Sequence, residues 1–140
     1  MPSLSGRFDP TIGVLINLGV APGNTLGNLT IPSTISVTTF PALVDTGASS
    51  TCISPSLATA IGVNPIGMRP MISATHSVPT NVYLVDLVVP FGANSIILPS
   101  IQVMEFNAGT NAPFQVLIGR DIICRGVFTM SFDGHFSFSL

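Results

Sequence analysis

At 140 residues the chain has the length of one domain, and we expect residues 1–140 to fold around a single core. Charged residues make up 7% of it, against about 25% in typical soluble domains. This predicts that a partner covers part of its apolar surface, most economically a second copy of the same chain. Because the only basic residues are four arginines scattered along the chain, we exclude a nucleic-acid-binding patch.

Segments that direct a protein to a membrane are not recognisable in the sequence. No stretch has the about 20 uninterrupted apolar residues that a membrane-spanning helix needs. The first residues, MPSLSGRFDP, lack the apolar part of a signal peptide. We therefore expect a soluble chain with no membrane partner and, by default, a cytoplasmic location.

The chain contains two cysteines, Cys52 and Cys124. Two thiols do not make a disulfide framework or a metal site. We interpret both as buried side chains, of the kind that free cysteine commonly forms in protein cores.

Glycine and proline divide the chain into short segments rich in Val, Ile, Thr and Phe, which is typical of an all-β fold. A polar, glycine-rich stretch over residues 19–33 is interpreted as a surface loop. The predicted strands, in chain order, are residues 11–18, 34–39, 42–44, 69–76, 81–89, 95–105 and 115–118.

Two short helices are predicted among the strands. Ser54 is suited to cap the first helix, Pro55 fits its first turn, and Gly62 ends it. The second is predicted over residues 120–125 and is closed by Gly126.

The end of the chain predicts a β-hairpin with arms at residues 127–132 and 135–140. Asp133 and Gly134 between the arms favour a tight type I′ turn. The second arm alternates phenylalanine with serine, so we expect one of its faces to be buried and the other to be exposed.

Two motifs stand out against this background. Residues 43–49, LVDTGAS, follow an apolar run with Asp45, Thr46 and Gly47. Residues 117–121, LIGRD, follow an apolar strand further along the chain. Alone, the first motif is also compatible with an ordinary turn, since Asp and Gly both favour turns. The second motif makes that interpretation much less favourable.

With these two motifs the sequence resembles the retropepsin-like aspartic proteases, the single-domain, retroviral-type relatives of the pepsins. The resemblance covers residues 11–140 in the order of its elements, with residues 43–49 as the active-site loop. It implies an all-β, closed, barrel-like acid-protease fold with one or two short helices. It also implies a homodimer that acts on a peptide or protein substrate and needs no cofactor or metal.

The chemistry gives an independent reason for this pattern. A peptide bond can be hydrolysed if one carboxylate takes a proton from water while a second, protonated carboxyl donates to the carbonyl oxygen. Two carboxyls at hydrogen-bonding distance keep one shared proton, because they cannot both ionise. The chain has one Asp-Thr-Gly, so the second carboxyl is expected from Asp45 of another copy. This predicts a homodimeric aspartic endopeptidase with Asp45 as its catalytic residue.

The resemblance also implies roles for the neighbours of Asp45. Thr46 is expected to hydrogen-bond across the dimer, and Gly47 to let the backbone and the substrate approach closely. Residues 68–85 are predicted to form a flap hairpin that closes over the substrate. The predicted substrate contacts are Ala48, Ser49, Ile72, Ser73, Ala74, Thr75 and His76, and the residues expected to support the site are Leu117, Ile118, Gly119, Arg120 and Asp121.

Two details of this prediction remain open. His76 at the flap tip is either a group that tunes closure between pH 5 and 7 or a solvated loop histidine. Retroviral enzymes commonly carry an acid where this chain has Ser49, and that acid pairs with the arginine of the later motif. Arg120 therefore needs another partner, for which Asp121 of the neighbouring subunit and Asp9 are candidates.

Two other functions are compatible with parts of the sequence. The first is a catalytically weak or inactive dimeric binding or assembly module on the same fold, since a fold does not define a function. The intact Asp45, Thr46 and Gly47 argue against it, because such a module has no need of a paired carboxylate. The second, a structural β-sandwich, explains the composition but leaves both motifs unaccounted for.

Overall fold

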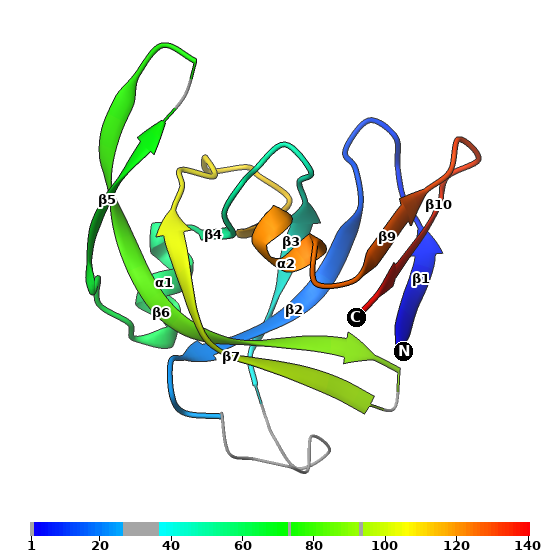
Figure 1. Cartoon of the computed structure of the whole chain (residues 1–140), viewed down its shortest axis with the longest axis horizontal. Coiled ribbons are helices and arrows are strands. Elements are labelled where there is room, and N and C mark those ends of the chain that lie inside the picture. The colour runs from blue at the N-terminus through cyan, green and yellow to red at the C-terminus, as the bar shows by residue number, and fades with distance from the viewer. Residues whose placement is uncertain (1, 27–36, 73, 93) are drawn as a thin grey trace.

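The computed structural model describes residues 2–26, 37–72, 74–92 and 94–140, which form two β-sheets and two short helices (Figure 1). The strands are β1 (Ser3–Arg7), β2 (Leu15–Pro22), β3 (Thr39–Val44), β4 (Cys52–Ile53), β5 (Gly67–Ile72), β6 (Ser77–Phe91), β7 (Asn94–Glu105), β8 (Val116–Ile118), β9 (Val127–Met130) and β10 (His135–Ser139). The helices are α1 (Pro55–Ile61) and α2 (Arg120–Ile123).

The larger sheet closes on itself. Strand β2 pairs with β3 on one side and with β6 on the other, so that six strands form a ring in the order β2, β3, β8, β4, β7, β6. Strand β5 pairs with β6 outside the ring, and the β5–β6 hairpin projects from the barrel (Figure 1). The prediction of an all-β, closed, barrel-like fold is confirmed, while the homodimer stays a prediction.

The smaller sheet joins the two ends of the chain. Its order is β1, β10, β9, and β1 pairs antiparallel with β10 from Ser3 opposite Ser139 to Arg7 opposite His135. Both ends of the chain therefore lie side by side at one end of the molecule (Figure 1).

Apolar side chains from the strands of the barrel fill its interior. The main contributors are Ile16, Leu18 and Val20 from β2 and Val85, Leu87 and Val89 from β6, all at most 5% exposed. They recur at every second position because successive side chains of a strand point to opposite faces. Burying each one contributes about 1.5–3 kcal/mol to folding.

Several strand boundaries differ from the prediction. Strand β2 begins at Leu15 and not at residue 11, because the N–H groups of Ile12 and Gly13 both donate to the carbonyl of Asp9 and form a turn. Strand β3 runs through Pro41, whose carbonyl still accepts from Gln115 although proline has no N–H. Residues 34–36 of the predicted strand 34–39 lie outside the described residues.

The first helix forms as predicted. Ser54 Oγ accepts from the N–H of Leu57 at 3.1 Å, Pro55 opens the helix, and Gly62 ends it in the left-handed conformation at φ 76°. Helix α2 ends at Ile123, earlier than predicted. In the part of the chain that the structure describes, neither helix is long and apolar enough to cross a membrane.

The final hairpin forms, but the prediction of its turn type was wrong. A type I′ turn needs positive φ at both central residues, and only Gly134 has it, at 85°. The N–H of Ser131 donates to His135 O and the N–H of Gly134 donates to Ser131 O, which makes a wider turn ending at the glycine. The predicted alternation of the second arm is confirmed, since Phe136 and Phe138 are buried.

One carboxylate is completely buried on the wall of the barrel. Asp86 lies at a bulge in β6 and accepts four backbone N–H groups, from Asn24, Thr25, Leu26 and Ser100, at 2.7–3.1 Å. Burial alone would raise the pKa of Asp86, but these four donors outweigh it and hold that pKa below its ordinary value. Asp86 therefore fastens the loop after β2 to Ser100, which lies in β7 at the same bulge.

Replacing Asp86 with Asn should lower the free energy of unfolding by about 3 kcal/mol at pH 7, because the amide loses the charge and turns an NH₂ group toward N–H donors. The pKa of Asp86 is lowered by folding, so its contribution is present above the ordinary value of 3.8 and is lost as the pH falls through the folded value. Urea denaturation of both proteins should therefore show a difference in the free energy of unfolding that becomes smaller at low pH. A difference in the free energy of unfolding that is equally large at pH 7 and pH 3 would contradict this role of Asp86.

Candidate active site

The first motif forms a tight loop at the end of β3. Strands β3 and β8 run parallel and pair Val44 with Ile118, so the two motifs begin next to each other. The N–H of Asp45 donates to Ile118 O at 2.9 Å, and the N–H of Gly47 donates to Asp45 Oδ1 at 3.0 Å. A Cβ at Gly47 would lie 3.2 Å from that oxygen, so glycine leaves the half-buried carboxylate uncrowded.

Residues of the second motif pack against and hydrogen-bond to the residues that follow this loop. Gly119 packs against the backbone of Ser50 so closely that a Cβ would lie 2.5 Å from the Ser50 carbonyl carbon. The N–H of Gly119 donates to Thr51 Oγ1 at 3.0 Å, and that hydroxyl donates to Asp121 Oδ1 at 2.8 Å. The Thr51 N–H donates to the other oxygen of Asp121 at 3.1 Å. The carboxylate of Asp121 is thus used within its own chain.

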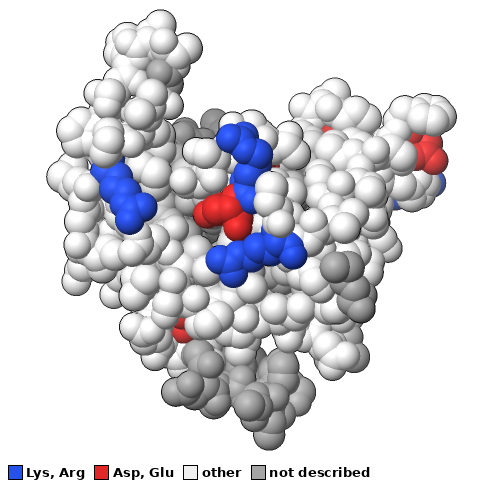
Figure 2. Space-filling view, viewed as in Figure 1, with Lys and Arg blue, Asp and Glu red and all other residues white. Residues whose placement is uncertain are grey.

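Arg120 binds the active-site loop directly. Its backbone N–H donates to Ala48 O and its Nη1 donates to Thr46 O, each at 2.9 Å. The carboxylate of Asp9, one of the partners considered for Arg120, instead accepts from the N–H and hydroxyl of Thr11. Figure 2 shows acidic and basic side chains gathered over α2, with a further basic side chain to the left and acidic atoms at the right edge of the same face.

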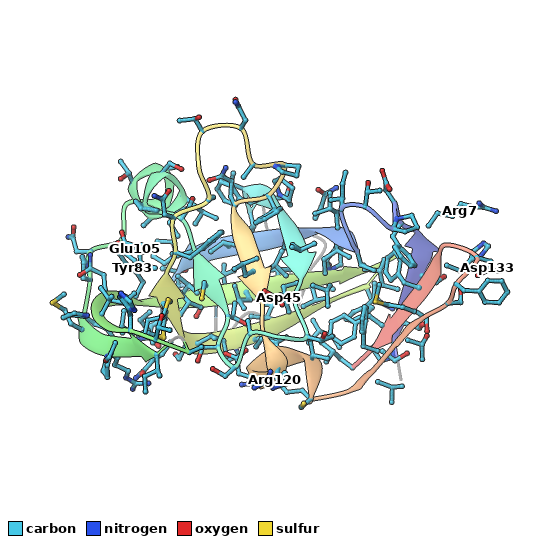
Figure 3. All side chains as sticks on the ribbon, turned by 90° about the horizontal axis from the view of Figure 1, so that it is seen from above. Arg7, Asp45, Tyr83, Glu105, Arg120 and Asp133 are labelled. Atoms are coloured by element: carbon cyan, nitrogen blue, oxygen red, sulfur yellow. The ribbon has the colours of Figure 1, made fainter. Side chains whose placement is uncertain are left out.

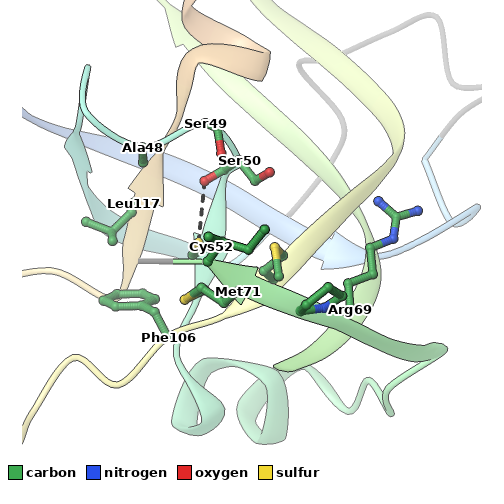
Figure 4. Close-up of a pocket in the computed structure, with 11 residues that line it drawn as sticks. Ala48, Ser49, Ser50, Cys52, Arg69, Met71, Phe106 and Leu117 are labelled. Carbon is green, nitrogen blue, oxygen red and sulfur yellow. Dashed lines mark hydrogen bonds between the residues drawn. The ribbon is translucent and has the colours of Figure 1, made fainter. Parts of the chain in front are cut away.

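A cavity of about 490 Å³ opens between the active-site loop and β5 (Figure 4). Three predicted substrate contacts, Ala48, Ser49 and Ile72, line it together. The other lining residues are Ser50, Cys52, Arg69, Pro70, Met71, Met104, Phe106 and Leu117. Figure 4 shows Leu117 and Phe106 on one side of Met71, with the two serines above them.

Part of the predicted flap lies away from this cavity. Ala74, Thr75 and His76 are exposed in the turn between β5 and β6, and His76 Nδ1 lies 2.8 Å from Thr75 Oγ1. Ser73 lies outside the described residues. The apolar wall that Met104 and Phe106 supply at the end of β7 was not predicted, although their two-residue spacing would place both on one face of a strand.

Cys52 is the thiol of this cavity. Burial raises the pKa of Cys52 to about 11, and the negative charges of Asp121 and Asp45 add to the effect. Its Sγ donates to Ser50 O at 3.4 Å, the contact drawn in Figure 4. The interpretation as a buried cysteine is confirmed for Cys52 and wrong for Cys124, which is exposed just after α2. Among the described residues, no group of His, Cys, Asp or Glu is arranged to hold a metal ion.

The sequence pattern of the aspartyl protease family matches residues 31–122, a range that includes both motifs. Since the match extends over more than half of the chain, the chain belongs to the aspartyl protease family. Among curated proteins, none matches the chain.

Solved structures show which fold within this family the chain adopts. A retropepsin-like aspartic protease from Rickettsia conorii superposes with a TM-score of 0.62 at 12% identity, covering 97% of this chain and 89% of its own. The retroviral protease-like domain of Ddi1 from Leishmania major gives a TM-score of 0.45 at 12% identity, covering 86% and 83%. The Rickettsia structure shows that the fold of the chain is retropepsin-like.

Replacing Gly119 with Ala should lower the free energy of unfolding by about 3 kcal/mol, because the new Cβ meets backbone atoms that cannot rotate away. Gly67→Ala is the matched control, since a Cβ there meets nothing within 4 Å. Chemical denaturation of both variants tests this. Equal stability of the two would mean that the contact between Gly119 and Ser50 is not needed.

In the native protein, iodoacetamide at pH 8 should modify the exposed Cys124 and leave Cys52 almost unmodified, because only the thiolate reacts and Cys52 is buried and protonated. Mass spectrometry of the digested protein measures both sites. In urea both cysteines should react at similar rates. Equal rates in the native protein would contradict the raised pKa of Cys52.

Proposed function

We propose that the chain is an aspartic endopeptidase that acts as a homodimer, with one Asp45 carboxyl from each copy. The observation that carries this proposal is the setting of Asp45, half-buried at the shared end of β3 and β8 with Oδ1 fixed by the Gly47 N–H. The adjacent cavity of about 490 Å³ has room for an apolar substrate side chain. Family and fold support peptide hydrolysis as the chemistry.

The need for a second copy follows from what the other acids do. Asp121 is the acid of the second motif, and both of its oxygens accept from Thr51. Asp86 accepts four backbone N–H groups inside the wall of the barrel. Neither carboxylate is available to share a proton with Asp45. A two-fold axis beside Asp45 would supply the partner as an identical carboxyl.

In the proposed reaction, one Asp45 accepts a proton from water as the water oxygen attacks the carbonyl carbon of the peptide bond. The protonated Asp45 of the second copy donates its proton to the carbonyl oxygen. As the C–N bond of the tetrahedral intermediate breaks, the amine receives a proton from the pair, and one hydroxyl of the intermediate gives its proton back to the pair as the new carboxyl group forms. No covalent intermediate, metal or cofactor is required.

The residues around Asp45 fit supporting roles in this scheme. Arg120 fixes the carbonyl of Thr46, so the loop has its shape before Thr46 meets the second copy. Ala48 and Ser49 border the cavity, where the substrate would bind as an added β-strand. We assign the whole of residues 1–140 to this one domain.

Two groups of exposed apolar side chains support a partner and a substrate. On the β5–β6 hairpin, Ile72 is 79% and Val78 is 54% exposed, as expected of a flap that covers a bound peptide. On the β9–β10 hairpin, Phe132, Met130 and Val127 are exposed. Exposed apolar groups of this kind commonly mark interaction surfaces.

Asp45→Asn should reduce the cleavage of a mixed peptide library between pH 4 and 7 by at least about a thousandfold, because the amide cannot carry the proton. Asp133→Asn is the matched control, since Asp133 lies on the distant hairpin turn (Figure 3) and should leave cleavage unchanged. Pepstatin should block the wild-type protein.

The solution mass, measured by light scattering, completes the test. Twice the mass of the chain, together with cleavage that depends on Asp45, is the expected result. A dimer that cleaves nothing at any pH would favour the binding or assembly module. A stable monomer that cleaves would contradict the shared pair of carboxyls.

A further inference from the structure

A second hollow lies beside the cavity at the active-site loop. This hollow has a volume of about 370 Å³ and is lined by Pro55, Pro79, Thr80, Glu105, Phe106 and Asn107. Phe106 lines both spaces, so they adjoin at this side chain. A peptide that fills the first cavity would reach the second by extending past Phe106.

Glu105 is the charged side chain of the second hollow, and it is held in a fixed position. Its Oε1 accepts from the hydroxyl of Tyr83 at 3.1 Å, and its Oε2 accepts from Nδ2 of Asn81 at 3.0 Å. Asn81 and Tyr83 lie two residues apart on β6 and so face the same side of the strand. Figure 3 shows Glu105 and Tyr83 together at the opposite end of the molecule from Asp133, with Asp45 between.

Both donors to Glu105 are neutral. Burial raises the pKa of Tyr83, and its bond to Glu105 and the charge of Glu105 raise it further, so the phenol remains a donor. A carboxylate that is hydrogen-bonded only to neutral groups keeps its full negative charge. The orientation of Glu105 is thus set while its charge stays uncompensated.

The described part of the chain offers no cation to Glu105. Its one ion pair within 4.0 Å joins His135 and Asp133, at 3.2 Å, on the distant hairpin turn. Arg69, the basic residue that lines the first cavity, donates instead to Gln102 Oε1. The half-buried carboxylate of Glu105 therefore presents a negative charge to an open hollow.

We propose that Glu105 determines substrate specificity by binding a lysine or arginine of the peptide, at a position outside the residue that fills the apolar cavity. This inference rests on the proposed function. An extended peptide would direct an apolar side chain into the cavity beside Ala48 and a basic side chain past Phe106 into the hollow of Glu105. The substrate class is then a peptide with an apolar residue near the cleaved bond and a basic residue further along.

The test measures peptide binding, so that it does not depend on cleavage. Fluorescent peptides with an apolar centre carry lysine at each outer position in turn, and each is paired with a peptide that has glutamine there. Both sets are titrated onto the Asp45→Asn protein and onto Asp45→Asn combined with Glu105→Gln. At one outer position we expect lysine to bind about fivefold tighter than glutamine, and Glu105→Gln to bring this ratio close to one.

Two controls separate a specific contact from a general effect of charge or folding. Asp45→Asn combined with Asp133→Asn removes one negative charge, as Glu105→Gln does, but far from the hollow of Glu105. It should keep the preference for lysine. Glu105→Gln keeps the shape of the side chain and an oxygen for Tyr83, and the amide of Asn81 can rotate to present its own oxygen. Thermal melting verifies that this variant is folded. In the Asp45→Asn protein with Glu105 intact, raising NaCl from about 0.05 to 0.5 M should weaken the preference for lysine.

Every outcome decides for or against Glu105. Equal binding of lysine and glutamine peptides at all positions would overturn the inference, and so would an equal loss of preference in the Asp133→Asn protein. A lysine preference that is lost with Glu105→Gln supports it, even if the wild-type protein cleaves no peptide. Absence of cleavage would then overturn the proposed function alone, so the two failures are distinguishable.

Discussion

The parallel pairing of β3 with β8 is the interaction on which the rest of the site depends. It joins two segments more than 70 residues apart. Both strands end at the same level of the sheet, where the N–H of Asp45 donates to Ile118 O. The pairing works only because Gly119, directly after β8, lets the Ser50 backbone pass at a distance that no side chain would allow. Thr51 and Asp121 then fasten the crossing with three hydrogen bonds. The loop that carries Asp45 is therefore held to the wall of the barrel by backbone and side-chain hydrogen bonds.

With six acidic residues, the chain uses its carboxylates for different purposes. Asp86 is surrounded by four backbone donors, which favour the ionised form and make it a structural group. Asp121 braces the crossing of the two motifs. In the part of the chain that the structure describes, the carboxylate of Asp45 accepts a single backbone N–H, from Gly47. The carboxylates of Asp86 and Asp121 are thus engaged in holding the fold, whereas the carboxylate of Asp45 accepts fewer hydrogen bonds.

Features with a local cause were predictable from the sequence, and features with a distant cause were not. Helix α1 follows from Ser54, Pro55 and Gly62, which act within one short segment. The two motifs can be recognised because each needs glycine at a fixed position. Strands β1 and β4 were missed because they are short and gain their hydrogen bonds from β10 and from β7 and β8. The apolar wall of the cavity was missed for the same reason, since Met104 and Phe106 meet the active-site loop only after the barrel closes.

The pairing of β1 with β10 has a consequence for the order in which the protein assembles. Ser3 lies opposite Ser139, so β1 finds its partner only after β10 has been synthesised. The barrel draws on residues between Leu15 and Ile118 and has no such requirement. During synthesis the barrel is therefore free to close while the sheet of the two ends is still incomplete, because contacts between distant residues carry the largest loop-closure cost. The nascent chain would pass through a stage in which β1 is an unpaired strand, exposed to any neighbouring chain at the same stage of synthesis.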